Sequence, residues 1–301
     1  AMSRAYRVPP ALTPGDSVMV VATSGAVREP QALAQGVDIW QKRGYQVRFS
    51  DHWQAQNGYL AGSDAQRQDA LLQAWQDPQI KAILCARGGY GAARLLESLN
   101  WPPLTQPKWL IGFSDVTSLL WTLAGQGITA LHGPVLTTLG AEPDWSLERL
   151  FNYLEGGALA ELQGQGWGGA TARGPLIVGN LTVATHLLAT PLLLDLRGAI
   201  LALEDVTEAP YRIDRMLTQW RLSGVLNQLG GLALGRFSRC QAPGGYPSWN
   251  VGEVLRERLG DLGLSIVADL PFGHDGPNPC LPLGAEAELD PGTGTLRILE
   301  S

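Results

Sequence analysis

Residues 109–124 read WLIGFSDVTSLLWTLA. The apolar run Trp109–Phe113 predicts a short buried strand, and the run Val116–Ala124 predicts a helix. Ser114 stands between them, so we expect a serine at a turn from a strand into a helix. Such a turn projects the hydroxyl from the edge of a sheet, close to the first amide groups of the helix.

The same alternation of strand and helix precedes this stretch. Short apolar strands are predicted at 18–22, 45–49 and 80–86, and helices at 30–43, 64–76 and 92–99. This order predicts an N-terminal α/β domain over residues 1–145, with a Rossmann-like or flavodoxin-like parallel sheet covered by helices on both faces. Ligands of such sheets bind at the carboxyl ends of the strands.

The pattern changes after residue 145. Periodicity weakens over residues 146–172, where glycines gather, and we interpret this stretch as a linker. Residues 173–301 predict a smaller, β-rich α+β domain. Its expected helices cover 181–189 and 213–222, and its expected strands lie near 199–203, 232–235, 265–268 and 295–299.

Composition excludes some classes of function. The chain of 301 residues has a formal net charge of -6 and no basic cluster, which argues against a nucleic-acid partner. Its three cysteines are far apart, so we expect no disulfide, no metal site and a reducing compartment. No stretch reaches the roughly 20 apolar residues of a membrane span, and residues 1–4 do not resemble a signal peptide. We therefore expect a cytoplasmic protein.

A glycine-rich loop, Arg87–Gly91 (RGGYG), is predicted at the same sheet edge as Ser114. It is not a dinucleotide-binding fingerprint, because the glycine pattern begins after a later strand and Arg94 stands where a small residue is needed. We therefore expect no NAD cofactor. Gly88 and Gly89 would let backbone amides approach a carbonyl oxygen, and the alternative is an ordinary tight turn.

Ser114 has two interpretations. Its surroundings match only half of the G-x-S-x-G nucleophile elbow, because Val116 replaces the second glycine. The alternative is a helix cap, which serine favours. A nucleophilic serine needs a base, and His274 in the loop FGHDGP is the first candidate, with His132 in reserve.

A base histidine is usually oriented by a carboxylate. Glu204 ends the apolar run AILALE, where burial favours a charged partner. An ion pair with Arg212 or Arg215 is the alternative role for Glu204. Of the other histidines, His186 is expected to pack within its helix.

Taken in order, several motifs resemble the LD-carboxypeptidase family, serine peptidase family S66. The segments that carry the resemblance are RGGYG at 87–91, IGFSDVT at 111–117, LEDVTEAPYRIDRML at 203–217 and FGHDGP at 272–277. The resemblance implies a Ser114–Glu204–His274 triad. It also implies an oxyanion hole made by the amide of Asp115 and that of Gly88 or Gly89.

The resemblance further implies an enzyme that needs no metal or other cofactor, forms a homodimer and releases terminal D-alanine from murein tetrapeptides. Candidate substrate-binding residues are Arg87, Tyr90, Asn180 and Arg212. Asn180 lies in Val178-Gly179-Asn180, which departs from the Gly-Gly-Asn common in the family. Two alternatives stay open: hydrolysis of aminoacyl-nucleotide antibiotics such as microcin C, and a non-catalytic protein of two lobes that binds a small molecule.

Overall fold

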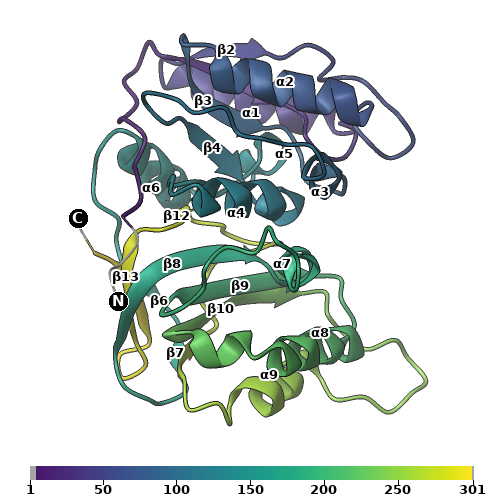
Figure 1. The fold of residues 1–301 in the computed structure, drawn as a ribbon, viewed down its shortest axis with the longest axis vertical. Helices are drawn as coiled ribbons and strands as arrows, with labels where there is room; N and C mark the ends of the chain where they lie inside the picture. Colours follow the sequence, from purple (N-terminus) through teal and green to yellow (C-terminus); the bar gives the residue numbers. More distant parts are fainter. Residues whose placement is uncertain (1–4, 300–301) are drawn as a thin grey trace. The chain divides into compact units, whose positions relative to one another are not determined.

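The chain folds into two compact units, shown as a ribbon in Figure 1. The computed structural model describes residues 5–299. The first unit contains the chain up to Ala158 together with Pro279–Gly284, and the second contains Leu159–Asn278 and the chain from Ala285 onward.

The predicted linker at 146–172 contains regular structure. Most of helix α6 (Asp144–Leu154) lies in it, as do the short strands β6 (Leu162–Gln163) and β7 (Gln165–Gly166). Its glycines form turns between these elements: Gly156 and Gly168 have φ of 101° and 97°, values that favour glycine. The short elements leave too little periodicity to be recognised in the sequence.

A six-stranded sheet forms the centre of the first unit, in the order β12-β5-β4-β3-β1-β2. Strands β1 to β5 are parallel, as predicted, and β12 is antiparallel to β5. The strands are β1 Ser17–Val21, β2 Gln46–Phe49, β3 Ile80–Cys85, β4 Trp109–Gly112, β5 Leu131–His132 and β12 Leu281–Pro282. The helices, besides α6, are α1 Pro30–Lys42, α2 Asp64–Gln76, α3 Ala92–Leu95, α4 Thr117–Gly125 and α5 Leu136–Leu139, and the 3-10 turn η1 is Ser114–Val116.

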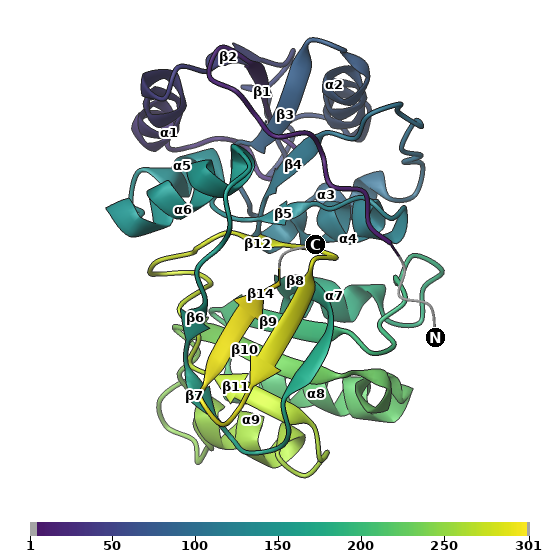
Figure 2. The same ribbon diagram turned by 90° about the vertical axis from the view of Figure 1, so that its left-hand side faces the viewer.

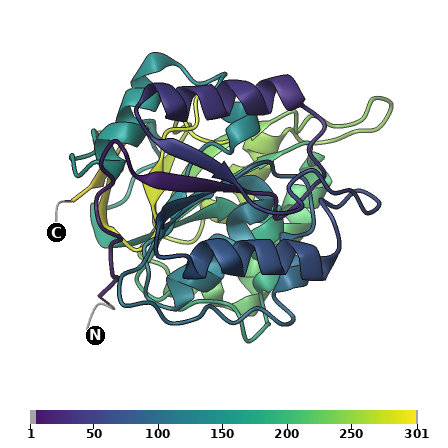
Figure 3. The same ribbon diagram turned by 90° about the horizontal axis from the view of Figure 1, so that it is seen from above.

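Helices cover both faces of this sheet. Helices α1, α5 and α6 lie on one face and α2, α3 and α4 on the other, as Figures 2 and 3 show. Every residue of the central strand β4 is buried, which explains its continuous apolar run. The carboxyl ends of β3 and β4 therefore lead directly into the Arg87–Gly91 loop and Ser114.

An eight-stranded mixed sheet forms the second unit, in the order β6-β14-β13-β8-β9-β10-β11-β7. Strands β8 to β11 are parallel neighbours in sequence order, and β13, β14, β6 and β7 pair antiparallel. The strands not yet given are β8 Ala172–Asn180, β9 Ile200–Val206, β10 Gly231–Ser238, β11 Ser265–Ala268, β13 Glu286–Asp290 and β14 Thr295–Ile298. The helices are α7 Leu181–Leu187, α8 Pro210–Ser223 and α9 Val251–Leu259, with a 3-10 turn η2 at Val225–Gln228.

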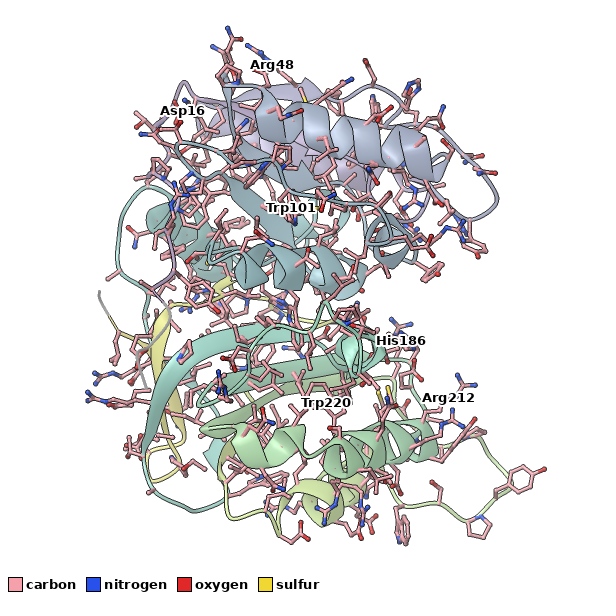
Figure 4. All side chains as sticks on the ribbon, in the orientation of Figure 1. Asp16, Arg48, Trp101, His186, Arg212 and Trp220 are labelled. Carbon is pink, nitrogen blue, oxygen red and sulfur yellow. The ribbon has the colours of Figure 1, made fainter. Side chains whose placement is uncertain are left out.

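The mixed α/β architecture predicted for the chain is confirmed. In the second unit, helices α8 and α9 lie side by side (Figure 1). Trp220 of α8 is fully buried there, and its indole nitrogen donates to the Thr185 hydroxyl at 2.9 Å (Figure 4). Within residues 5–299, no helix has the length and apolar character needed to cross a bilayer.

Candidate active site

Ser114 begins η1 directly after strand β4 and has a φ of +63°. This left-handed conformation costs a residue with a Cβ about 1–3 kcal/mol, and such strain gathers at functional sites. The helix-cap alternative does not fit, since a cap residue normally has extended backbone and Val116 occupies the cap position of α4. Ser114 therefore sits in a strained turn between a strand and a helix, as in a nucleophile elbow.

Gly88 lies directly beside Ser114. A Cβ placed on Gly88 would be 3.3 Å from the Ser114 Cβ and 3.4 Å from its hydroxyl oxygen. The Gly88 carbonyl accepts a hydrogen bond from the Gly25 amide at 2.9 Å. Because the peptide bond is trans, the N–H of Gly89 points to the side opposite Gly25. The predicted glycine loop is thus brought against the serine.

Asp115 follows the serine and is buried, with 3% of its surface exposed. Its Oδ2 accepts from the Ala92 amide at 2.9 Å, and it is also hydrogen-bonded by the Gly91 amide and the Ser24 hydroxyl. Burial raises the pKa of the carboxyl, against the opposing effect of these donors. The Asp115 side chain thus holds the end of the glycine loop.

Glu204 and His274 meet within the second unit. Glu204 is near the end of strand β9 and is fully buried, and its Oε2 lies 2.8 Å from Nδ1 of His274. The His274 amide also donates to this oxygen, at 3.4 Å. A carboxylate on Nδ1 favours the tautomer that leaves Nε2 to accept a proton, which is the arrangement of a general base.

The pKa of His274 lies above its ordinary value. Burial lowers it, but the hydrogen bond and negative charge of Glu204 outweigh that effect, with smaller contributions from Asp205 and Asp275. The imidazole is therefore a stronger base than a free histidine. This property suits a group that takes a proton from a hydroxyl.

Asn180, predicted to bind substrate, is buried within the carboxylate network instead. Its amide nitrogen donates to Glu204 at 3.3 Å and to Asp205 at 3.0 Å, and its oxygen caps α7 by accepting from the Val183 amide at 3.1 Å. The side chain is 4% exposed. These contacts favour a role in orienting Glu204. The sequence held one signal of this, an asparagine directly before a helix.

Arg236 of strand β10 supports the His274 loop, and sequence reasoning missed it. Its guanidinium donates to the backbone carbonyls of Gly273, His274 and Pro277 at 3.1–3.3 Å. A Cβ on Gly276 would lie 2.7 Å from the Arg236 guanidinium carbon, so a larger residue there would displace the guanidinium. No motif in the sequence connects residues 236 and 274, because the contact depends on how the loop folds back.

The prediction that Glu204 forms an ion pair with Arg212 or Arg215, offered as its alternative role, is wrong. Arg212 lies on the outer side of α8, 3.9 Å from Glu208, and its Nε donates to the Tyr211 hydroxyl (Figure 4). Arg215 stands over the Tyr211 ring, 5.5 Å from its centroid. Glu204 is instead paired with His274.

The other histidines occupy different surroundings. His132, the reserve candidate for the base, is fully buried in the first unit, with its ring edge-on to that of Phe113 at 5.9 Å. His186, expected to pack within its helix, is exposed on α7 because it lies on the solvent side of this short helix (Figure 4).

Arg87 and Tyr90 both lie on the glycine loop. Arg87 is 3.3 Å from Glu29 in an ion pair and covers Gly25 so closely that a Cβ there would be 2.0 Å from the guanidinium. Tyr90 is 48% exposed and contacts the Tyr59 ring, with centroids 5.8 Å apart. Among the described residues, no group of three or more His, Cys, Asp or Glu side chains is arranged to hold a metal ion.

Both units match known sequences. Residues 18–133 match the family model described as the LD-carboxypeptidase N-terminal domain, and residues 173–289 match the LD-carboxypeptidase C-terminal domain. A Synechocystis sp. protein with a provisional carboxypeptidase name is 58% identical over 299 residues, 99% of each chain. The murein tetrapeptide carboxypeptidase of Pseudomonas aeruginosa is 37% identical over 261 residues, 82% of this chain and 84% of that one.

Solved structures share the fold. A muramoyltetrapeptide carboxypeptidase from Oxalobacter formigenes has a TM-score of 0.83 and 27% identity, covering 94% of this chain and 97% of that one. MccF in complex with glutamyl sulfamoyl guanosine has a TM-score of 0.87 at 20% identity, with 98% of each chain covered, and this likeness concerns the fold alone. The chain belongs to the LD-carboxypeptidase family, peptidase family S66, and is a carboxypeptidase of the serine hydrolase type.

Proposed function

We propose that this protein releases the terminal D-alanine of murein tetrapeptides by means of a Ser114–Glu204–His274 triad. The observation that carries the proposal is the pair formed by a fully buried Glu204 and Nδ1 of His274 at 2.8 Å. The strained φ of Ser114 supports the choice of nucleophile. The murein tetrapeptide carboxypeptidase of P. aeruginosa supports the choice of substrate.

In the proposed mechanism, His274 takes the proton of the Ser114 hydroxyl as the oxygen attacks the carbonyl that precedes the terminal D-residue. The imidazolium then donates this proton to the leaving amine, and Glu204 stabilises its charge. A water molecule, deprotonated by the same histidine, hydrolyses the acyl-enzyme. Each proton transfer uses Nε2, because Nδ1 is bound to Glu204.

The oxyanion donors in this proposal are the backbone N–H groups of Asp115 and Gly89. Gly89 is preferred to Gly88 because the Gly88 carbonyl is bound to Gly25, which turns the next N–H away from that residue. Donors fixed before the reaction stabilise the developing charge without reorganisation.

Arg87 is the residue we propose to bind the free carboxylate of the substrate, with Tyr90 beside it. Arg87 is about one quarter exposed, and its ion pair with Glu29 is long enough to be exchanged for a substrate anion. Arg212 is a weaker candidate, since it is exposed on α8 and close to Glu208. An anchor for a charged end would explain a preference for terminal residues.

The test is product analysis with a murein tetrapeptide ending in D-alanine. We expect D-alanine and the tripeptide, and no release from the same peptide with an amidated C-terminus or a terminal L-alanine. An acyl-sulfamoyl adenylate, the substrate type of the antibiotic-hydrolysing alternative, is assayed in parallel. Faster cleavage of that compound than of the tetrapeptide would refute the proposed substrate, and no turnover of either would favour a binding protein.

We further propose that the protein acts in the cytoplasm as a homodimer, as expected from the sequence and from its resemblance to the LD-carboxypeptidase family. Sedimentation analysis at micromolar concentration tests the oligomeric state, and cell fractionation tests the compartment. A monomer at all concentrations, or a protein recovered outside the cytoplasm, would refute the corresponding part.

A further inference from the structure

We propose that Arg67 and the Asp115 side chain are positioning residues that fix the Arg87–Gly91 loop, and through it the oxyanion donor on Gly89. This inference rests on the proposed function, because it gives the loop its catalytic purpose.

Arg67 connects loops from different parts of the first unit. It lies on α2, and its side chain is fully buried. One guanidinium nitrogen donates to the carbonyls of Thr23 at 2.7 Å and Gly91 at 2.8 Å, and Nε donates to the Gly62 carbonyl at 3.3 Å. The third nitrogen pairs with Asp64. Three chain segments thus depend on one side chain.

Gly91 is held from both sides. Its carbonyl accepts from Arg67 at 2.8 Å, while its amide donates to the Asp115 carboxylate, which also accepts from the Ala92 amide. A cation therefore binds one end of the residue and an anion binds the other. Charge-assisted hydrogen bonds are roughly twice as strong as neutral ones, so this arrangement restrains the end of the loop.

The fit around Gly91 leaves little freedom. Its φ of +130° is accessible only to glycine, and a Cβ there would lie 2.4 Å from Leu60 and 3.1 Å from the Arg67 guanidinium. Gly89 is two residues away and has a φ of +102°. A chain fixed at Gly91 and at the Gly88 carbonyl has few ways to move the intervening amide.

A purely structural role does not require a buried guanidinium. Apolar side chains of similar volume often stabilise a protein as well as a buried charge does, because desolvation offsets the attraction. What an apolar side chain cannot do is specify the direction of several carbonyl groups. Arg67 does this for Thr23, Gly62 and Gly91 together, and a backbone fixed in this way holds the nearby Gly89 N–H in place before the reaction.

The experiment compares Arg67→Met, which keeps the length of the side chain, with Arg94→Met as the matched control. Arg94 binds the same Asp64 at 2.9 Å but is 46% exposed. Hydrogen exchange of the amides in residues 88–92 and steady-state kinetics with the tetrapeptide are measured for both. The second variant is Arg67→Lys, which keeps the positive charge but loses the planar set of guanidinium N–H donors. It replaces Arg67→Met in the experiment if that variant does not fold.

We expect Arg67→Met to speed exchange in this loop at least about tenfold and to lower kcat about 10² fold, with KM within about threefold, since a misplacement of about 1 Å has such an effect. Arg67→Lys should give the same changes in smaller size, and Arg94→Met neither. Unchanged exchange would overturn the inference, as would faster exchange with unchanged kcat. A parent protein that does not cleave the tetrapeptide refutes the proposed function instead, and the exchange data alone then decide whether Arg67 orders the loop.

Discussion

Ser114 in the first unit and His274 in the second unit are oriented in different ways. Ser114 is oriented by its backbone, through a strained φ of +63° and the close approach of Gly88. His274 is held by a fully buried Glu204, whose negative charge also raises the pKa of the imidazole. The difference matches the roles proposed for the two residues: a nucleophilic hydroxyl needs a direction, whereas a base also needs an adjusted proton affinity.

Replacement of Ser114 by Ala is expected to have the largest effect, because no other group replaces the attacking oxygen. We expect kcat for release of D-alanine to fall on the order of 10⁶-fold, as in other serine hydrolase triads. Ser98→Ala, which changes an exposed serine of the same unit, is the control and should keep parental turnover. Parental activity in Ser114→Ala would refute the proposed nucleophile.

Glu204→Gln tests whether the negative charge of Glu204 sets the pKa of His274. Only the neutral imidazole acts as the base, so kcat/KM rises with pH through the pKa of His274. Glu204 raises that pKa, so the acid limb of the parental profile lies above the ordinary value of about 6.5. In Glu204→Gln, burial still lowers the pKa of His274 but no carboxylate at position 204 raises it. The acid limb of the profile should therefore move to lower pH, and we expect kcat to fall about 10⁴-fold.

The control for this change is Glu208→Gln, which removes a carboxylate that pairs with Arg212 and accepts from Thr182. Its profile should match that of the parent. An acid limb that does not move in Glu204→Gln would mean that the carboxylate orients the ring without adjusting its proton affinity. The contrast between Ser114 and His274 would then be lost.

Gly88→Ala tests the backbone surroundings of Ser114. The added methyl group would lie 3.3 Å from the Ser114 Cβ, closer than ordinary contact, so the loop must shift away from the serine. We expect kcat to fall about 10²–10³-fold, the effect of losing one oxyanion donor. Gly244→Ala, at a glycine with no neighbouring atom within 4 Å, should leave kcat unchanged. Equal kinetics in both variants would contradict the proposed oxyanion hole.

Arg236→Met tests the support of the His274 loop and is expected to have the smallest effect. Loss of its bonds to the loop carbonyls should lower kcat about 10²-fold or less, because the ring keeps its contact with Glu204. Arg239→Ala breaks only an exposed ion pair with Asp275 in the same loop, and should change kcat less than about fivefold. Equal losses in the two variants would show that the loop does not depend on the hydrogen bonds of Arg236.

Much of the fold was predictable because parallel strands are buried on both faces and read as continuous apolar runs. Strand β4 is an example, as is β3 from Ala82 onward, and both the glycine loop and Ser114 follow such runs. The pairing of Leu281–Pro282 with β5 was not predictable, since a strand of two residues has no periodicity and its partner is about 150 positions earlier.

The candidate site residues also include some that were predictable from the sequence and some that were not. Ser114, Glu204 and His274 stand beside glycine-rich turns or apolar runs, so their positions could be recognised in the sequence. The contacts that support them could not: Arg67, Asn180 and Arg236 bind backbone or side-chain groups that are 24 to 44 residues away in the chain. No residue pattern specifies which carbonyl a buried guanidinium will meet, because tertiary structure alone creates that contact.

The late position of strand β12 in the sequence affects how the first unit folds while the chain is being synthesised. Residues 279–284 complete the sheet of the first unit, yet they are translated after residue 278, when nearly all of the second unit has been made. During synthesis, β5 is therefore left as an open sheet edge while more than a hundred residues emerge from the ribosome. A fragment ending near residue 158 would carry the same exposed edge, so the N-terminal unit produced alone is expected to aggregate unless residues 279–284 are supplied in trans.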